Sequence, residues 1–427
     1  MLFVLHLLAA LTAGLHMLTL VTIAAVPDHR CFIDGVDTNT TIADWNSTEI
    51  ISAIPLINGE LDRCHMFVSG TEDITTCSQY VYDDTYYKDT VSIEWNMVCE
   101  NRYRGAIAQT LYMLGVFTGA VVLGALADTL GRKKVFCWAA TFQIIFGIAA
   151  AFAPEYYSFV FIRYLYGIVG SAGSYQAGFV LTMELVGPSK RTPCGITFQA
   201  VFAAGIMLVA GWGAIIKERQ LLQIVYGLHG LLLFAHWWIM DESPRWLWTQ
   251  GRQVEAVNIV AKAVKMNKRG IGLDKEHYLS RTKPRRDVSE APKSATGMSD
   301  LFKTPNLRIK TLNVCFCWFA NSIAYYGLSL STGNLGGNPY FNLFIMSLVE
   351  IPSYIAVILL LDRLGRRSMT SGFMLTNGQP MQESIEDGEN FGNGDTFFTT
   401  GLGRKPVRGE YSIPPEQQMV NLEDGKK

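Results

Sequence analysis

Residues 105–134 have the sequence GAIAQTLYMLGVFTGAVVLGALADTLGRKK. The first 23 of these residues carry no charged side chain, whereas the seven that follow, DTLGRKK, hold one acidic and three basic side chains. An apolar stretch of about 20 residues is long enough to cross a bilayer as a helix. A basic turn placed directly after such a helix tends to stay in the cytoplasm. The stretch therefore predicts a transmembrane helix that ends at a tight inner turn.

Seven further segments of the same kind surround it. All eight together contain only three charged side chains, although charged residues make up 17% of the 427-residue chain. The chain is therefore predicted to be an all-α polytopic membrane protein. The net charge of −1 gives no global positive field for nucleic acid. The eight predicted spans are residues 2–26, 105–127, 135–153, 157–186, 195–216, 221–240, 311–331 and 340–361.

The first of these spans has a second interpretation, as a secretory signal peptide. Ala24 and Ala25 are small residues near a possible cleavage point. However, no basic residue precedes the segment, and its apolar run is longer than a normal signal core. We therefore expect an uncleaved span.

The two long loops between spans differ in the sign of their charge. Residues 27–104 carry 14 acidic and 5 basic side chains, whereas residues 241–310 carry 8 acidic and 15 basic ones. Five predicted spans separate these loops, which places them on opposite sides of the membrane. Because basic loops stay inside, we expect residues 27–104 to be extracellular, and residues 241–310 and both termini to be cytoplasmic. The sequons at Asn39 and Asn46 both fall in the first loop, where glycans are added.

Four of the eight cysteines lie in the predicted extracellular loop, at Cys31, Cys64, Cys77 and Cys99. An oxidising compartment favours two disulfides, for which three pairings are possible. A zinc site is the alternative, but no C-x-x-C or paired histidines support it.

The basic turn recurs in the second part of the chain. D-x-x-G-R-[KR] occurs at 128–133 and again 234 residues later, which is what matching loops of two related halves predict. In each copy glycine permits a tight turn, and the aspartate can pair with arginine or face a helix N-terminus. The alternative is basic charge that only sets topology. The candidate gate residues here are Asp128, Gly131, Arg132, Asp362, Gly365 and Arg366.

With several other segments, this repeat resembles the major facilitator superfamily, and more narrowly its organic cation and carnitine transporter family of solute carriers. The segments, in chain order, are PDHRC (27–31), EWNMVCE (94–100), the two D-x-x-G-R copies, RYLYG (163–167), ESPRWL (242–247) and YYGL (325–328). The resemblance implies two bundles of six helices each. It also implies that spans nine to twelve are absent here, because Leu375 runs directly into a segment similar to the tail after the twelfth span.

The expected domains follow from this comparison. They are an N-terminal bundle at 1–240, the cytoplasmic loop at 241–310, a partial C-terminal bundle at 311–375 and a disordered cytoplasmic tail at 376–427.

The resemblance also implies a function. We expect a plasma-membrane carrier that moves a small organic cation or a carnitine-like zwitterion by alternating access, crippled in this form. The alternative is a non-transporting short isoform, or an incomplete gene model, that at most regulates the full carrier and is retained in the endoplasmic reticulum. No enzyme motif, metal site or cofactor is expected, and the oligomeric state is left open.

The charged residues within spans are the first candidates for a substrate site. Glu350 lies near the middle of the eighth span beside Pro352, where a carboxylate can neutralise an organic cation; a structural ion pair is the alternative. Arg163 is expected to order helix packing, since it would repel a cation. Glu184, seven residues before Arg191, is expected to form a gate or loop salt bridge.

Aromatic and amide side chains complete the candidate site, because aromatic faces attract amines by about 0.5–2 kcal/mol each. The glycines of the fourth span are attributed to close helix packing, and histidines in spans to neutral side chains that bond backbone carbonyls. The candidates, which the resemblance places at the cavity, are Tyr325, Tyr326, Tyr175, Gln176 and Gln199.

Overall fold

The computed structural model describes residues 2–37, 44–45, 47–57, 60–68, 73–266, 300–331, 337–365, 368–369 and 371–372. All eight predicted spans are helical, which confirms the all-α polytopic class. Six helices are long and apolar enough to cross a membrane. The other two predicted spans are the fourth, which changes its helical winding midway, and the seventh, which carries Asn313 and Asn321.

The first six spans form one group of helices, in part from several helical pieces. Its elements are α1 (Leu2–Met17), α2 (Thr19–Ile23), α5 (Tyr103–Leu130), α6 (Arg132–Ala149), η2 (Ala150–Phe152), α7 (Tyr156–Gly167), η3 (Ile168–Gln176), α8 (Ala177–Leu185), α9 (Pro188–Ile215), α10 (Arg219–Leu228), η4 (His229–Leu233) and α11 (His236–Ile239). After it come α12 (Pro244–Thr249), α13 (Gln253–Met266), α15 (Asp300–Lys303), α16 (Pro305–Ser331) and α17 (Pro339–Leu364).

Glycine lets the fourth span pack closely against the second. A Cβ added to Gly167 would collide with the backbone oxygen of Tyr112, and one added to Gly115 would collide with that of Tyr164. The backbones of α5 and α7 are therefore in contact, as the close-packing interpretation expected. Beyond Gly167 the chain winds as a π-helix over η3, a widened turn that often accompanies functional sites.

The loop that the sequence predicts to be extracellular, residues 27–104, contains three short antiparallel strand pairs in its described part. β1 pairs with β6, β2 with β3, and β4 with β5. Disulfides join Cys31 to Cys77 and Cys64 to Cys99, which confirms two bridges and selects one of the three pairings. Its elements are β1 (His29–Cys31), α3 (Thr48–Ala53), β2 (Leu56–Ile57), β3 (Glu60–Leu61), β4 (His65–Phe67), β5 (Ile74–Thr76), β6 (Tyr80–Tyr82), α4 (Val91–Glu94) and η1 (Cys99–Asn101).

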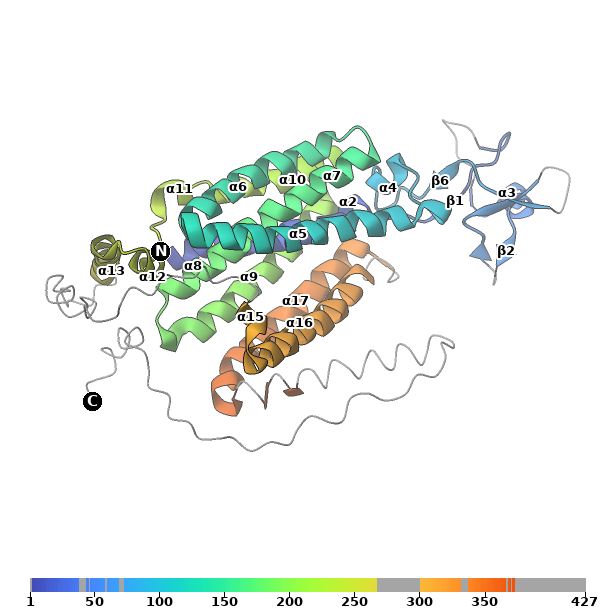
Figure 1. The fold of residues 1–427 in the computed structure, drawn as a ribbon. Coiled ribbons are helices and arrows are strands. Elements are labelled where there is room, and N and C mark those ends of the chain that lie inside the picture. Colours follow the sequence, from blue (N-terminus) through green and yellow to red (C-terminus); the bar gives the residue numbers. More distant parts are fainter. Residues whose placement is uncertain are drawn as a thin grey trace.

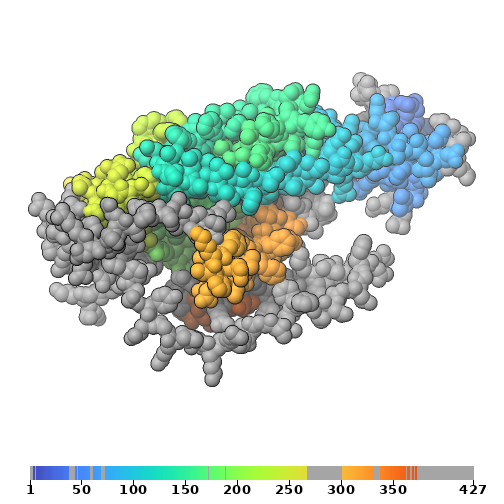
Figure 2. Space-filling model, viewed as in Figure 1, coloured from blue at the N-terminus to red at the C-terminus, as the bar shows by residue number. Residues whose placement is uncertain are grey.

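The long loops lie at opposite ends of the helices. The strand domain projects from one end of the first group, and α12 and α13 lie at the other end, next to the N-terminus (Figure 1). α17 packs along α9 (Figure 1), and Tyr325 of α16 lies against Glu350 of α17. In the space-filling view, α15 and α16 form the orange patch below α5 (Figure 2). The sequons at Asn39 and Asn46, most of the inner loop (267–299) and the tail after 372 lie outside the described residues.

Candidate functional site

Glu350 lies halfway along α17, one helical turn before Tyr354. The Tyr354 hydroxyl donates a hydrogen bond to Glu350 Oε2 at 2.9 Å. Tyr325 of α16 also interacts electrostatically with this carboxylate. Among the described residues no basic side chain pairs with Glu350, so the structural ion pair considered as its alternative role is not present there. Glu350 is thus a half-buried carboxylate held by phenol groups.

Tyr326 connects this carboxylate to the first group of helices. Its ring packs edge-on against Tyr325 at 5.3 Å, and its hydroxyl donates to Met17 Sδ at 3.3 Å. Tyr175 of η3 lies in the vicinity of both Tyr326 and Tyr354. The tyrosines of α16, α17 and η3 therefore meet between the two groups of helices.

Tyr175 is held in place by the fifth span. Its hydroxyl donates to Gln199 Oε1 at 3.2 Å, and its ring packs against Phe198 and Phe202 with centroids 5.3 and 5.7 Å away. Gln176, the next residue, is exposed. The structure thus brings together five of the six candidate substrate residues, and Gln176 does not join them.

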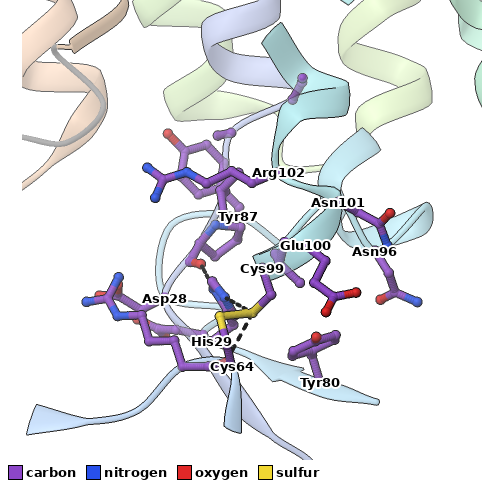
Figure 3. A pocket seen from close by; sticks show the side chains of 18 of the residues that line it. Asp28, His29, Cys64, Tyr80, Tyr87, Asn96, Cys99, Glu100, Asn101 and Arg102 are labelled. Atoms are coloured by element: carbon purple, nitrogen blue, oxygen red, sulfur yellow. Dashed lines mark hydrogen bonds and ion pairs between the residues drawn. A yellow bond between two sulfur atoms is a disulfide. The ribbon is translucent and has the colours of Figure 1, made fainter. Parts of the chain in front are cut away.

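A cavity of about 1540 Å³ opens between the strand domain and the outer ends of the helices. Leu20 and Gln109 of the first two spans line it, as do Gly337 and Pro339 just before and at the start of α17. Both groups of helices therefore border one outer cavity. The charged and aromatic residues that line it include Asp28, Glu100, Arg63, Arg102, Tyr80 and Tyr87 (Figure 3).

His29 also lines the cavity, but it does not form a metal site with the nearby cysteines. Its Nε2 lies 3.9 Å from Cys99 Sγ (Figure 3). Cys64 and Cys99 are bonded to each other, so neither offers the thiolate that binds zinc. Burial lowers the pKa of His29 from its ordinary value, which keeps the ring neutral at pH 7.

At the opposite end, the inner turn is fixed by a residue that the sequence did not single out. Glu242 Oε1 accepts hydrogen bonds from the backbone N–H groups of Arg132 and Lys133 at 3.0 and 3.1 Å. A carboxylate is favourable there because it lies at the N-terminus of α6. Trp246 Nε1 also donates to the backbone oxygen of Asp128 at 2.8 Å. The ESPRW segment thus holds the D-x-x-G-R-K turn.

Side chains of the turn form ion pairs of their own. Arg132 pairs with Asp128 at 2.8 Å, as the motif predicted, and with Glu184 of α8 at 3.5 Å. Glu184 therefore makes the expected loop salt bridge, but not with Arg191, whose Nε donates to the Val186 oxygen instead.

The second copy of the motif repeats the backbone of the first. Gly131 has φ +108° and Gly365 has φ +81°, values that disfavour residues with a side chain. In both copies the glycine N–H bonds the carbonyl four residues earlier, that of Ala127 or of Leu361. Asp362 lies in the last turn of α17, and Arg366 lies outside the described residues.

Most histidines in spans behave as the neutral interpretation expects. His229 Nδ1 lies 2.8 Å from the Val225 oxygen and His236 Nδ1 lies 2.9 Å from the Leu233 oxygen, while His6 Nδ1 bonds the Thr182 hydroxyl. His16 is the exception, because neither ring nitrogen has a partner among the described residues. Arg163 is fully buried and donates to Thr19 Oγ1 at 3.3 Å.

Comparison with known proteins gives one coherent result. A family model described as "Sugar (and other) transporter" matches residues 45–376. The chain is 37% identical over 396 residues to the organic cation transporter protein of Drosophila melanogaster, covering 88% of this chain and 71% of that protein. It is 31% identical over 392 residues to solute carrier family 22 member 1 of Oryctolagus cuniculus, covering 84% of this chain and 68% of that protein.

A similar fold is found among solved structures. The partially occluded inward-open xylose transporter XylE from E. coli matches with a TM-score of 0.51 and 13% identity, over 86% of this chain and 73% of that one. At this identity the likeness bears on the fold alone.

Proposed function

Because this chain belongs to the major facilitator superfamily, and within it to the organic cation transporter family of solute carriers, we propose that it binds a small organic cation or zwitterion beside Glu350. The observation that carries the proposal is the state of this carboxylate. It is half-buried in a predicted span, is hydrogen-bonded by a phenol and has no basic partner in the described part of the chain.

The surrounding side chains suit a cation. An ammonium group placed near Glu350 would meet the rings of Tyr325, Tyr326 and Tyr175, and each aromatic face adds roughly 0.5–2 kcal/mol. Because these tyrosines come from both groups of helices, a bound cation would join the two groups. That is the place where rocking of two bundles can expose a site to either side in turn.

The two ends of the molecule support an outward-facing arrangement. The outer cavity is open to the strand domain, whereas the cytoplasmic turn is tied by Glu242 and by the Arg132 ion pairs. We infer that breaking the contacts of this turn accompanies opening toward the cytoplasm. We further propose that the chain is a multi-pass plasma-membrane protein with the strand domain outside and α12 and α13 inside.

The test is binding of labelled ligands to the purified chain in lipid nanodiscs. Glu350→Gln removes the charge and keeps the shape, and we expect it to weaken tetraethylammonium binding by roughly tenfold, or about 1.4 kcal/mol. Binding of carnitine, whose own carboxylate reduces the net attraction, should weaken less. Glu255→Gln is the matched control, because Glu255 is an exposed carboxylate of α13 that forms an ion pair only with Arg252 among the described residues. An unchanged affinity for tetraethylammonium in Glu350→Gln would exclude Glu350 from the site.

We further propose that this form is impaired as a transporter. Several apolar side chains of α16 stay exposed, among them Trp318 at 69% and Phe319 at 64%, as do Asn313 and Asn321. Amides that face hydrocarbon cost a few kcal/mol each. We therefore propose that the chain alone binds substrate but does not concentrate it. The second candidate function is regulation of the full carrier, because the exposed face of α16 could pack against another chain.

A further inference from the structure

A buried arginine without a carboxylate partner lies inside the first group of helices, apart from Glu350. The Arg163 side chain is fully buried in α7. Its Nη1 donates to Thr19 Oγ1 and its guanidinium lies over the Tyr112 ring at 4.8 Å, but Nε and Nη2 have no hydrogen-bond partner in the described part of the chain. An unpaired charge in such a place is costly unless a partner neutralises it.

The other two buried arginines show what such a residue normally has. Arg30 pairs with Asp37 and Arg219 pairs with Glu94. No carboxylate of the described residues pairs with Arg163. Arg163 therefore differs from the other two buried arginines of the described structure in lacking a carboxylate partner.

Further polar groups without partners surround this guanidinium. His16 interacts with Arg163, its ring lies edge-on to Tyr166 at 5.2 Å, and the rings of Tyr166 and Tyr112 are 6.2 Å apart. Both His16 nitrogens and the Tyr166 hydroxyl are buried without a hydrogen-bond partner among the described residues, whereas the Tyr112 hydroxyl lies beside Ser171. Buried polar groups nearly always have a partner, so a cluster of unpartnered ones indicates something that binds there.

The cluster lies just below the floor of the outer cavity. Leu20 and Gln109 line that cavity, Leu20 follows Thr19 directly, and Gln109 lies one turn before Tyr112 on α5. The buried Gln109 amide is also without a hydrogen-bond partner in the described structure. The lining of that cavity carries both signs of charge, because Arg63, which pairs with Asp28, and Arg102 lie there together with Asp83 and Glu100.

We propose that Arg163 is the centre of a binding site for a small monovalent anion that enters from the outer cavity. Guanidinium N–H groups, phenol hydroxyls and an imidazole N–H are all donors, which suits chloride or a carboxylate. The anion is either free in solution or the carboxylate of a zwitterionic substrate, and the second source rests on the proposed function.

Contacts between the two clusters make the second source geometrically reasonable. Tyr326, beside the Glu350 cluster, lies in the vicinity of Tyr112, over whose ring the Arg163 guanidinium lies. Ser171 Oγ and the Tyr326 hydroxyl both contact Met17 Sδ, at 3.8 and 3.3 Å. A ligand whose cationic end lies at Glu350 would have to extend past Met17 for its carboxylate to reach Arg163, and the second experiment tests whether it does.

The first experiment uses the unmodified chain in nanodiscs. Its thermal unfolding midpoint is measured while chloride replaces gluconate, a much bulkier anion, at constant ionic strength. A free-anion site raises the midpoint by roughly 2–4 °C as chloride approaches saturation. Arg163→Gln should remove this rise, and in gluconate it should be at least as stable as the unmodified chain because it lacks the unpaired charge. Arg219→Gln is the control, because Arg219 pairs with Asp89 and Glu94, and chloride should still raise the unfolding midpoint of this variant.

The second experiment separates the two sources of the anion. If carnitine binds at Arg163 through its carboxylate, Arg163→Gln weakens carnitine binding at least about tenfold and leaves binding of choline, which has no carboxylate, unchanged. Loss of choline binding in Glu350→Gln tests the proposed function separately from both. The anion site is refuted if chloride, acetate and carnitine each act equally on the unmodified chain and on Arg163→Gln.

Discussion

Gly131 shows how a single residue fixes the inner turn. Its φ of +108° favours glycine, and a Cβ at this position would collide with the Glu242 carboxylate. Gly365 has a similar backbone but open space around it. The first copy of the motif therefore needs glycine both for its backbone conformation and for the space that Glu242 occupies. The second copy needs glycine for its backbone conformation alone.

We expect Gly131→Ala to destabilise the protein more than Gly365→Ala. Strain in this backbone region costs about 1–3 kcal/mol, and only Gly131→Ala must also displace Glu242 from the N-terminus of α6. Gly124→Ala, in open space on α5, should cost nothing or stabilise slightly. Thermal unfolding of the three variants in nanodiscs gives the order. Equal losses for Gly131→Ala and Gly365→Ala would show that the Glu242 contact contributes little.

The contact between Glu242 and the turn also marks the limit of sequence interpretation at this scale. Both motifs were visible, and pairing with arginine was one of the two roles expected for Asp128, which the structure shows paired with Arg132. Glu242 is 110 residues from Arg132, and no local pattern joins them. Likewise, both His16 and His229 are histidines within predicted spans. Only the structure shows that His229 has a hydrogen-bond partner and that His16 has none among the described residues.

At the scale of elements, the strand domain depends on its two disulfides. Cys31 and Cys77 lie in a small core with Ile50 and Ile54, and the second bridge ties Cys64 to Cys99 just before α5. The sequence predicted two bridges but not their pairing, because the cysteines become neighbours only through strand pairing. The π-helical turn of the fourth span was not predicted either, since glycine-rich segments also occur in ordinary helices.

We predict that peptides linked through Cys31–Cys77 and Cys64–Cys99 appear in digests of unreduced protein from the secretory pathway, with glycans on Asn39 and Asn46. Mass spectrometry measures both. The double variant Cys31→Ser/Cys77→Ser should lose about 2–4 kcal/mol of domain stability, seen as faster proteolysis of residues 27–104 than of the helices. Either of the other two pairings would contradict the structure.

At the scale of the whole molecule, the charge pattern and the helices agree. The acidic strand domain lies at one end of the helices and α12 and α13, the described start of the basic loop, lie at the other, as the odd number of intervening spans predicted (Figure 1). The helical character and order of the eight predicted spans followed from the sequence, whereas the resemblance offered Tyr175, Tyr326 and Glu350 only as cavity candidates. The sequence did not predict that Arg163 lacks a carboxylate partner in the described structure. That depends on which side chains surround it after folding.

The last prediction concerns transport by the chain on its own. Alternating access needs two bundles that close on each other, and in the described structure the first six spans face only α16 and α17. With Asn313 and Asn321 exposed on α16, one side of the substrate region lacks cover. We therefore expect no saturable uptake of labelled tetraethylammonium by cells that express this chain.

The matched comparison is a version in which four further spans, taken from the Drosophila organic cation transporter that the chain resembles, are inserted after Leu375. Surface labelling must accompany uptake, because retention in the endoplasmic reticulum would also abolish it. Restored uptake in the extended version, with both forms at the surface, supports a missing cavity wall. Equal saturable uptake by both forms would contradict the prediction and would mean that copies of the chain cover one another's open side.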